Sequence, residues 1–533
     1  MTSPVTITAE LGVDNAATAT VSVIPPLLFA GISNAIAIDE NNVVVSFQPA
    51  TGGQPPYTYT VYRSAVEGVL GTAEGMTLTT ETSATYSIAD VMTGNAVFYT
   101  VQVADSLASD LDNNLVQASV LKGPVRFVDA TNTGTANGGP GTPYTTLLAA
   151  VASLPNGGTI NISAAPYSVL PRDFSTSPGI QFVGGFSGFV DSNTTATDWV
   201  RGETNTGLEY DGVSVSSGAL LRLGDGSVLS GFDVGAAYTG SDNIVQSTGR
   251  LEIRDSVLGS TDVANTATRI DHTTGGLSLI DTAVLAASTG LTCVRSVDGI
   301  VTLSGVLFDG CSMEASVSVD PAVSVTVRSS TFQNGTEGLS VTTGTATIRN
   351  ATFDSIAGEA ITLVDADLDV DASTFRDGST AVSVNGLGGV VFTRSEVTNM
   401  RNGLSGSIRS AAGERRPVMI QNNVFETTQG SPVNLGSNGT TGVYDVDVRG
   451  NTFVWLGSGN ETGLDLDLSN EEPMLSGALM VLDNVFLDFA NAIDVFVREG
   501  NNAGDTDVAL VADFSNNYGR SSFGYGKGID ALF

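Results

Sequence analysis

The chain has 533 residues, with 22 Lys and Arg against 56 Asp and Glu, so its formal net charge is −34. A chain this acidic offers no basic stripe, and nucleic acid and anionic membranes are therefore poor predicted partners. Charged residues make up 15% of the chain, hydrophobic residues 41%, and there are 62 glycines. This composition is too apolar for a disordered acidic tail and too rich in glycine for a helical protein, so it predicts a folded, mostly β chain.

The N-terminal region carries no membrane or export signal that can be read from the sequence. The uncharged stretch at residues 15–38 contains two prolines and many polar residues, so we expect no membrane span there. No positively charged segment precedes an apolar core at the N-terminus. If the protein is secreted, we expect its signal peptide to be absent from this chain.

Residues 1–29 are predicted to be a β-strand extension. Small apolar and polar residues alternate in VTITAEL (5–11) and ATATVSV (17–23), which is typical of one or two strands. Two interpretations stay open. The strands pack on the next domain, or they pair with the sheet edge of another subunit.

Residues 30–122 show longer alternating runs separated by turn residues, which predict a β-sandwich. The strings PPYTYTVYRS (55–64) and FYTVQVADS (98–106) are similar to the two facing central strands of fibronectin type III and related immunoglobulin-like domains. Phe47 stands where many members carry Trp. The resemblance implies a spacer or a binding module rather than a catalyst.

A linker signal at 122–124 is followed by one predicted helix. The segment TPYTTLLAAVASLP (142–155) is amphipathic, with Tyr144, Leu147, Leu148 and Val151 expected on one face. We expect this helix to close the open end of the structure that follows.

An eight-residue unit recurs through the rest of the chain, for example as VTVRSSTF (325–332), ATIRNATF (346–353) and VDVRGNTF (446–453). Successive units end 21 to 33 residues apart, and the longest spacings come after Val397. A nearly constant spacing predicts a solenoid, with loops inserted in its last coils.

Within the unit, places one and three are apolar while two and four are polar, which predicts a strand with one buried face. Place eight is usually Phe, and these rings are expected to form an interior column. Place six changes along the chain, and its residues are Ser330, Ala351, Ser373, Ser395, Asn423, Asn451, Asn484 and Asn516. Asparagine tolerates the left-handed conformation, so we expect an asparagine ladder at a bend between strands.

Three short strands per coil with such a ladder resemble the right-handed parallel β-helix of the pectin-lyase-like superfamily. The opening FVDATNTGTANGGPGTPYTTLLAAV (127–151) and the GGF of FVGGFSGF are similar to the start of β-helix domains on bacterial surface and secreted proteins. The predicted fold is therefore all-β. A right-handed parallel β-helix solenoid over residues 123–533 follows an N-terminal β-sandwich domain at 30–122.

The resemblance raises an enzyme hypothesis, because many β-helix relatives cleave acidic polysaccharides. Relatives similar to polygalacturonases need an adjacent Asp-Asp pair and a Gly-His-Gly, and this sequence has neither. The single histidine, His272, lies in a turn-like segment. Lyases use an Arg or Lys base with calcium, and the densest cationic stretch, IRSAAGERRP (408–417), is interpreted as an exposed loop. We therefore predict no catalytic and no cofactor-binding residue, and we favour a non-enzyme.

One acidic row stands out in VDADLDVDAS (364–373), where carboxylates alternate with apolar residues and are expected on the outer face, namely Asp365, Asp367, Asp369 and Asp371. Calcium could bridge such oxygens between coils. The favoured interpretation is an ion-pair ladder without metal, because Asp371 lies one repeat beyond Arg349. Cys293 and Cys311 form one disulfide or stay two buried thiols, and the sequence leaves both alternatives open.

The favoured function is a non-catalytic extracellular or cell-surface protein, structural or adhesive, assembled into a filament or appendage through its N-terminal strands. Its expected partner is another copy or another surface protein, with carbohydrate as a further candidate. One alternative is a secreted lyase or hydrolase of acidic polysaccharide, with its cleft on the long coils between Val397 and Tyr518. A second is a carbohydrate-binding protein similar to phage tailspikes.

Overall fold

The structure is a computed structural model. It describes residues 3–10, 16–23, 27, 29, 32–37, 43–47, 49–65, 69–73, 84–88, 97–106, 115–120, 123–177, 179–187, 189, 205–210, 218–262, 268–287, 291–316, 323–409, 415–427, 429–437, 443–457, 462–467, 478–489, 491–496 and 511–519. The chain divides into two compact units, Met1–Val125 and Arg126–Phe533.

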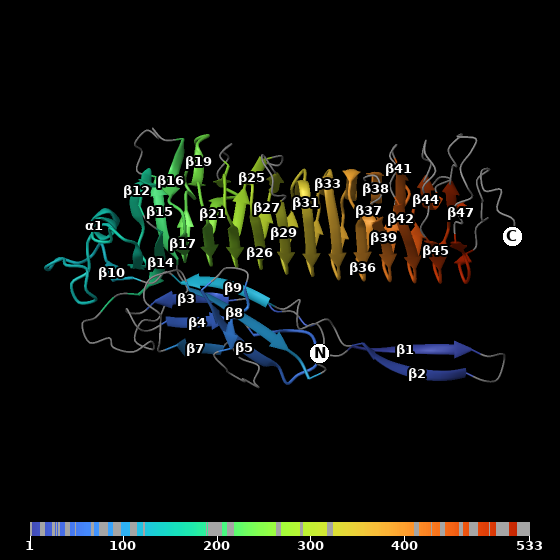
Figure 1. Cartoon of the computed structure of the whole chain (residues 1–533), viewed down its shortest axis with the longest axis horizontal. Helices are drawn as coiled ribbons and strands as arrows, with labels where there is room; N and C mark the ends of the chain where they lie inside the picture. Colours follow the sequence, from blue (N-terminus) through green and yellow to red (C-terminus); the bar gives the residue numbers. More distant parts are fainter. Residues whose placement is uncertain are drawn as a thin grey trace. The chain divides into compact units, whose positions relative to one another are not determined.

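The described residues of the first unit form three antiparallel sheets (Figure 1). A two-stranded sheet consists of β1 (Ser3–Glu10) and β2 (Ala16–Val23). A three-stranded sheet has the order β3 (Ile32–Ala37), β4 (Val43–Phe47), β7 (Ala84–Ile88). A four-stranded sheet has the order β6 (Thr72–Ala73), β5 (Thr58–Ser64), β8 (Val97–Ala104), β9 (Leu115–Val120).

An aromatic cluster joins the three-stranded and four-stranded sheets of this unit. The rings of Phe47 in β4 and Tyr59 in β5 lie 4.9 Å apart, and Phe29 contacts both rings edge-on. All three residues are buried, so the alternation in the sequence does build a core here. The assignment of these strands to a fibronectin type III or immunoglobulin-like sandwich stays a prediction.

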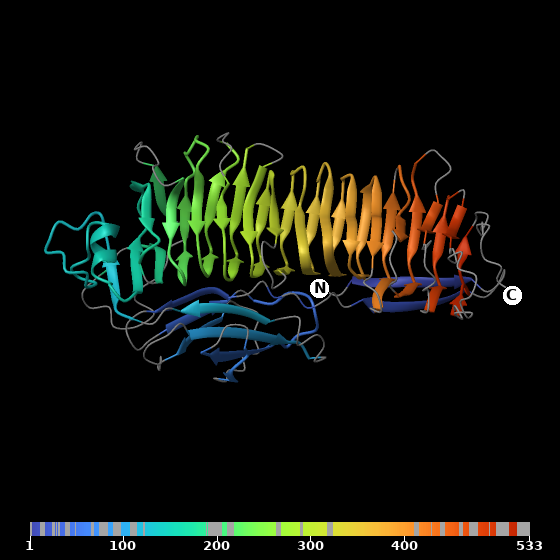
Figure 2. The ribbon, with the colours of Figure 1, turned by 45° about the horizontal axis from the view of Figure 1, so that its top comes forward.

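The second unit is a parallel β-solenoid whose strands pair between coils in three ladders, which we call the first, second and third sheets (Figures 1 and 2). The first and third ladders join into one continuous sheet. After β10 (Val125–Val128), the first sheet contains β11 (Gly158–Ser163), β14 (Ile180–Phe186), β17 (Ser227–Ser230), β20 (Leu251–Arg254), β23 (Leu277–Ile280), β26 (Ile300–Ser304), β29 (Val323–Arg328), β31 (Leu339–Arg349), β33 (Glu359–Asp371), β36 (Val390–Thr393), β39 (Arg415–Gln421), β42 (Val443–Arg449), β45 (Ala478–Leu482) and β48 (Val511–Asp513).

The second sheet contains 14 short strands, β12 (Tyr167–Leu170), β15 (Thr206–Tyr210), β18 (Phe232–Val234), β21 (Val257–Ser260), β24 (Ala283–Ala286), β27 (Leu307–Asp309), β30 (Thr331–Gln333), β32 (Thr352–Asp354), β34 (Thr374–Arg376), β37 (Glu396–Met400), β40 (Val424–Thr427), β43 (Thr452–Trp455), β46 (Val485–Leu487) and β49 (Tyr518–Gly519). The eight-residue unit of the sequence is therefore a strand of the first sheet, a corner, and the start of a strand of the second.

The third sheet contains β13 (Arg172–Phe174), β16 (Ala219–Leu223), β19 (Asn243–Ser247), β22 (Ile270–His272), β25 (Leu291–Val297), β28 (Cys311–Ser316), β35 (Thr380–Leu387), β38 (Asn402–Arg409), β41 (Val433–Ser437), β44 (Thr462–Asp467) and β47 (Asn491–Phe496). The first parts of β31 and β33 also belong to it, because both strands run through the corner between the third sheet and the first.

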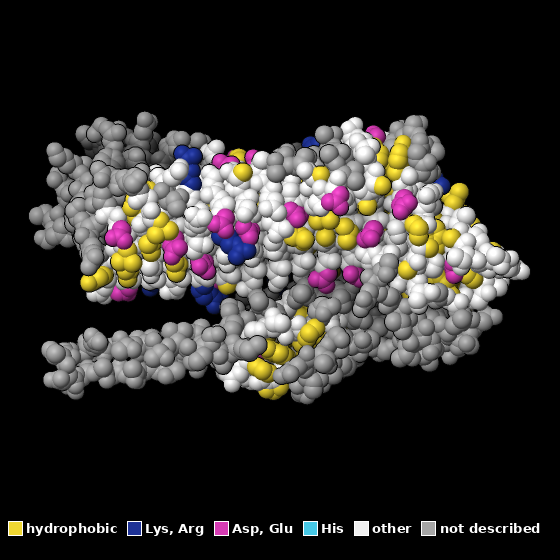
Figure 3. Space-filling model, turned by 180° about the vertical axis from the view of Figure 1, so that it is seen from behind, with side chains coloured by type: hydrophobic (Ala, Val, Ile, Leu, Met, Phe, Trp, Pro, Cys, Tyr) yellow, Lys and Arg dark blue, Asp and Glu magenta, His cyan; other side chains and the backbone are white. Residues whose placement is uncertain are grey.

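Outward places on these sheets carry the charge of the chain. In the described part of the surface that Figure 3 shows, acidic side chains are spread along the solenoid, and the few basic ones lie in small groups beside them. Inward places are apolar and buried, as the alternation predicts. Most of the charge therefore lies on the outside of the solenoid, and the exceptions include Glu252, Arg254 and Arg269, which are fully buried.

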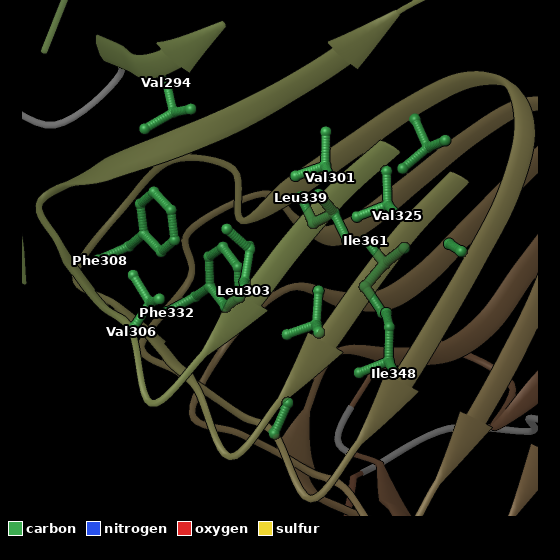
Figure 4. Close-up of a cluster of buried hydrophobic side chains, with 14 of the residues drawn as sticks. Val294, Val301, Leu303, Val306, Phe308, Val325, Phe332, Leu339, Ile348 and Ile361 are labelled. Carbon is green, nitrogen blue, oxygen red and sulfur yellow. The ribbon is translucent and has the colours of Figure 1, made fainter. Parts of the chain in front are cut away.

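The predicted column of phenylalanine rings fills the interior at the second sheet (Figure 4). Phe308 and Phe332 stack with centroids 4.6 Å apart, and Phe332 and Phe353 are 4.8 Å apart. Where place eight is Val397, the ring of Phe392 on the first sheet takes up the column, 5.6 Å from Phe375. Burial of each ring stabilises the fold by roughly 1.5–3 kcal/mol.

The predicted ladder is present, but the sequence interpretation needs two corrections. The left-handed residue is at place five, not six, as at Ala372 (φ 49) and Asn422 (φ 58). The last amide of the ladder is Asn517 rather than Asn516, because Asn484 donates to Asn517 Oδ1 at 3.0 Å. This corner holds one more residue than the pattern assumed, so Gly519 pairs with Phe486.

The predicted helix is also shorter than expected. Helix α1 spans Leu147–Ala152, and the Thr146 hydroxyl caps it by accepting from the Ala149 backbone NH. Leu147, Ala150 and Leu154 are buried, whereas Leu148 is 60% exposed, so Leu148 was placed on the wrong face. Leu147 and Leu154 join the interior of the first coils, consistent with a cap at this end.

None of the described helices is long and apolar enough to cross a membrane. The insertions expected to form a cleft on the late coils, residues 410–414, 438–442, 458–461, 468–477 and 497–510, lie outside the described residues.

Candidate functional site

The acidic row of β33 faces outward as predicted, with one exception. Asp367, Asp369 and Asp371 alternate with buried apolar residues on the first sheet. Asp365 instead lies at the bend between the third sheet and the first, with φ 53. Three of the four carboxylates therefore share one strand face.

The carboxylates of Asp365 and Asp367 bind groups of later coils. Asp365 Oδ1 accepts a hydrogen bond from the Leu387 backbone NH at 2.8 Å. Asp367 accepts from the Gly389 NH at 2.7 Å and from Arg416 Nη1, which lies 2.7 Å from both of its oxygens. Gly389 directly precedes β36 (Val390–Thr393), the strand of the intervening coil, and has no side chain of its own.

This contact corrects the interpretation of residues 408–417 as an exposed loop. Arg415–Gln421 is strand β39, and the Arg416 side chain is only 26% exposed. Arg416 reaches across one intervening coil to Asp367, 49 residues earlier. Of this stretch, residues 410–414 lie outside the described residues.

Asp369 and Asp371 are also ion-paired, but not quite as expected. Arg349 stands opposite Asp371 in the register, as predicted, yet its guanidinium bonds Asp369. Asp371 is bound by Arg394 Nε at 2.8 Å and by the Thr393 hydroxyl at 2.9 Å. Burial alone would raise the pKa of Asp371, but the hydrogen bonds and charge of Arg394 outweigh it and hold the pKa below its ordinary value.

The acidic row is thus a set of ion pairs that tie neighbouring coils. Its oxygens already have arginine or amide partners, which leaves little of their charge for a bound cation. Among the described residues, no group of three or more His, Cys, Asp or Glu is placed to hold a metal ion.

His272 is part of the core and not of a turn. It ends strand β22, is fully buried, and its Nε2 donates to the Gly249 carbonyl at 2.9 Å. Its Nδ1 lies 2.9 Å from the Ser296 hydroxyl, which then acts as the donor. Burial lowers the pKa of His272, so the ring stays neutral and structural.

One carboxyl has a pKa that is typical of general acids, and sequence reasoning missed it. Burial, together with the charge of Asp255, raises the pKa of Asp281 to about 7. Its Oδ2 has no exposed surface and no hydrogen-bond partner. A substrate cannot reach that oxygen, so Asp281 does not form an active site in this conformation.

Cys293 and Cys311 form a disulfide, which decides between the two alternatives left open by the sequence. Cys293 lies in β25 and Cys311 begins β28, one coil later in the third sheet. The bridge is buried and links adjacent coils.

The third sheet carries a different kind of surface, a row of uncharged polar side chains on successive coils. The register places each member directly opposite the next, in the order Ser340, Thr362, Ser383, Ser405 and Asn434. Each side chain is at least partly exposed, and within the described structure none of the five makes a side-chain hydrogen bond. We call these five residues the hydroxyl row.

Charged residues occupy the same line before and after the hydroxyl row. Glu314 stands opposite Ser340, and Asp465 stands opposite Asn434. Earlier coils carry polar pairs on this face, such as Arg222 with Asp173 at 3.3 Å. The hydroxyl row is therefore a neutral segment within an acidic surface.

The sequence contains this row in the triplets LSV (339–341), ITL (361–363) and VSV (382–384). Their first and third letters are apolar, and their middle letters are members of the row. The nearly equal spacing of Ser340, Thr362, Ser383 and Ser405, at 22, 21 and 22 residues, was the signal that could have revealed its first four members.

The comparisons with known proteins agree with the fold. A family model described as a right handed beta helix region matches residues 304–475, so the parallel solenoid is right-handed. A search of curated proteins finds no match. The solenoid thus confirms the predicted right-handed β-helix, while the immunoglobulin-like assignment of residues 30–122 is not confirmed.

Two solved structures are also similar at a low level. A Family 28 exopolygalacturonase from Yersinia enterocolitica has a TM-score of 0.27 and 9% identity, covering 93% of this chain and 98% of that one. The pectate lyase Pel3 from Pectobacterium carotovorum has a TM-score of 0.14 and 14% identity, covering 73% and 89%. At these TM-scores they carry no argument about activity, which must come from the residues.

Proposed function

We propose that this protein acts on polysaccharide, and that it binds a neutral polysaccharide chain along the hydroxyl row of the third sheet. The observation that carries the proposal is the row itself. Five uncharged side chains on successive coils stand in register, and none of them makes a side-chain hydrogen bond within the described structure.

The chemistry of the row suits sugar hydroxyls. Serine and threonine hydroxyls and the asparagine amide both donate and accept hydrogen bonds, as sugar hydroxyls do. Neighbouring strands of a sheet repeat every 4.7–4.9 Å. A polymer that lies across the coils can therefore meet an equivalent group at each step, on a rigid surface that loses little entropy when it binds.

The charge distribution favours a neutral polymer over an acidic one. The net charge of −34 repels polyanions, and the acids at both ends of the row, Glu314 and Asp465, add to this repulsion. Binding of uronate polymers would need cations at the row, and its five members carry none.

A disulfide supports an extracellular location. Bridges such as Cys293–Cys311 persist in oxidising compartments and are rare in reducing ones. Polysaccharides of cell walls and capsules are met in the same compartments. The location is thus consistent with the proposed ligand.

The test compares two triple variants of the full chain. The row variant carries Thr362→Ala, Ser383→Ala and Ser405→Ala. The control variant carries Thr331→Ala, Thr352→Ala and Thr374→Ala, a matching hydroxyl line on successive strands of the second sheet. Affinity electrophoresis through gels containing neutral glucans, mannans, xylans or polyuronates measures binding.

We expect the wild type and the control variant to be retarded by a neutral polymer. The row variant should bind at least tenfold more weakly, since each hydroxyl contributes about 0.5–1.5 kcal/mol. Equal binding by both variants, or no retardation of the wild type by any polymer, would contradict the proposal. The same mixtures are read for reducing ends and for the absorbance of unsaturated products, which detects cleavage.

A further inference from the structure

A second row of uncharged residues runs beside the hydroxyl row on the third sheet. It lies two residues further along each strand, and the register again places each member opposite the next. Its members, from the earliest coil to the latest, are Thr342, Val364, Asn385, Ser407 and Gly436. Each of them is at least partly exposed. We call the hydroxyl row and this second row together the neutral strip.

The polar side chains of the neutral strip have no hydrogen-bond partner within the described structure. This holds for the hydroxyl row and for Thr342, Asn385 and Ser407 of the second row. Ser407 Oγ also has no exposed surface, which is unfavourable until rotation of the side chain brings the hydroxyl to a partner. By contrast, Asp367 and Asp371, on the first sheet of the same solenoid, are bound by arginines of other coils. The neutral strip thus keeps hydrogen-bonding groups that the fold itself does not use.

The neutral strip is shallow and regular. Its longest side chain is that of asparagine, so no residue of the strip projects far above the sheet. Neighbouring coils repeat roughly every 4.7–4.9 Å, and the two rows are about 7 Å apart because two residues of a strand separate them. Five coils therefore form a surface about 19 Å long and about 7 Å wide.

These dimensions suit one class of neutral polysaccharide. In a β-1,4-linked chain of glucose, mannose or xylose both glycosidic bonds are equatorial, so the chain is an extended ribbon. Each sugar advances the ribbon by about one ring length, which is close to the spacing of the coils. Successive rings are turned over, so both edges of the ribbon carry hydroxyls that donate and accept. Chains with α-1,4 or β-1,3 linkages curve into helices, and their rings turn away from a straight row.

From these observations we propose that the ligand of the neutral strip is an extended β-1,4-linked chain of neutral sugars. It lies along the axis of the solenoid, with one sugar on each of five coils. The hydroxyl row contacts one edge of the ribbon, and the second row contacts the other edge. This inference rests on the proposed binding of neutral polysaccharide, and it adds the linkage, the direction and the length of the bound segment.

The test measures dissociation constants of oligosaccharides of two to six sugars by isothermal titration calorimetry on the full chain. The β-1,4-linked series of glucose, mannose and xylose are compared with α-1,4-linked and β-1,3-linked series of glucose. The three glucose series contain the same sugar and differ in shape. The shortening variant is Asn434→Ala, which removes the last member of the hydroxyl row. The control variant is Thr331→Ala, which removes a partly exposed hydroxyl of the second sheet.

We expect at least one β-1,4-linked series to gain about threefold or more in affinity with each sugar up to the fifth, and little with the sixth. Glucose pentasaccharides of the other two linkages should bind at least about tenfold more weakly than the pentasaccharide of that series. Asn434→Ala should bind the pentasaccharide only as tightly as the wild type binds the tetrasaccharide. Its affinity for the tetrasaccharide should change by about twofold or less, because four coils remain intact. Thr331→Ala should behave as the wild type does.

Equal affinity for all three linkages of glucose, or a β-1,4-linked series without this dependence on length, would overturn the inference. So would an Asn434→Ala variant that loses tetrasaccharide and pentasaccharide binding to the same extent. If no oligosaccharide binds, while a neutral polymer still retards the wild type and not the triple row variant, this inference fails and the proposed function stands. If no neutral polymer retards the wild type, both fail.

Discussion

The corner between the first and second sheets is built in two ways along the same solenoid. In the earlier coils place six is mostly serine. Ser373 Oγ accepts from the Ala351 backbone NH at 3.2 Å and donates to a carbonyl of its own coil, that of Asp371, at 3.0 Å. Each such hydroxyl therefore makes one bond to a neighbouring coil.

In the later coils place six is asparagine, and each amide makes several bonds between coils. Asn451 Oδ1 accepts from the backbone NH and from Nδ2 of Asn423, at 3.0 and 2.9 Å. Its own Nδ2 donates to the Ile420 carbonyl at 2.7 Å and to Asn484 Oδ1 at 2.9 Å. One side chain thus ties three coils together.

The change from serine to asparagine at place six coincides with an increase in the length of the coils. Successive ladder residues are 22 residues apart at Ser373, but 28 and 33 apart around Asn451. Closing a longer loop costs more chain entropy, and each coil with an insertion must regain its register. We infer that asparagine amides keep neighbouring coils in register where insertions are longest, and that a serine hydroxyl is sufficient where coils are short.

The phenylalanine column should be equally important in both regions, and this gives the largest expected effect. Phe353 has stacked rings at 4.8 and 4.9 Å, and Phe453 has them at 5.2 and 4.8 Å. Phe353→Ala and Phe453→Ala should each lower the free energy of unfolding by about 3–5 kcal/mol. Urea unfolding followed by circular dichroism measures both losses. A much smaller loss in one region would show that the two regions differ in more than the corner.

The side chains at place six should contribute differently to the free energy of unfolding in the two regions. Asn451→Ala leaves the Asn423 NH, the Ile420 carbonyl and other buried groups unpaired, and we expect a loss of about 3 kcal/mol. Ser373→Ala should cost only about 1 kcal/mol, because it leaves one buried amide of a neighbouring coil unpaired. Hydrogen exchange at Asn423 and at Ala351 reports each corner locally. Asn451→Ser, which places the hydroxyl of the early coils in a long coil, is expected to fall between the two. Equal losses in the two alanine variants would remove the distinction.

The interior of the solenoid could be predicted from the sequence because it repeats. Burial forces the same apolar letters into places one, three and eight of every coil, so the pattern is visible without coordinates. The shift from Asn516 to Asn517 was not visible. The corner contains one added residue, but positions 516 and 517 are both asparagine and the strand pattern is unchanged. The sequence therefore does not show which of the two amides joins the ladder.

The outer surface was harder to predict, because its contacts depend on which coils are neighbours. Arg416 bonds Asp367 across an intervening coil, in which Gly389 has no side chain and its backbone NH also bonds Asp367. The hydroxyl row consists of serine and threonine, which are common on any surface, and it becomes a row only when the register is known. Coil lengths of 21 to 33 residues hide that register in the sequence.

The smallest expected effect is a pH dependence that belongs to the serine region. In that region an ion pair on the outer surface links neighbouring coils beside the corner. Arg394, at place five of its unit, bonds the carboxylate of Asp371 in the previous coil. The pKa of Asp371 is held below the ordinary 3.8, so the pair stabilises the fold above about pH 4 and loses this effect as the pH falls through the folded-state pKa. Arg394→Gln should therefore cost about 1 kcal/mol or less near neutral pH, since Arg394 is half exposed, and nothing in strong acid.

Arg449→Gln is the matched control in the asparagine region, because among the described residues the Arg449 side chain donates hydrogen bonds only to Asp447 of its own strand. Urea unfolding at neutral and at acid pH gives the difference between each variant and the wild type. We expect the difference for Arg394→Gln to disappear in acid, and that for Arg449→Gln to be smaller at both pH values. If the two variants lose the same stability at neutral pH, the outer ion pairs do not compensate for the missing amides. The serine corners would then hold their register by strand pairing and the phenylalanine column alone.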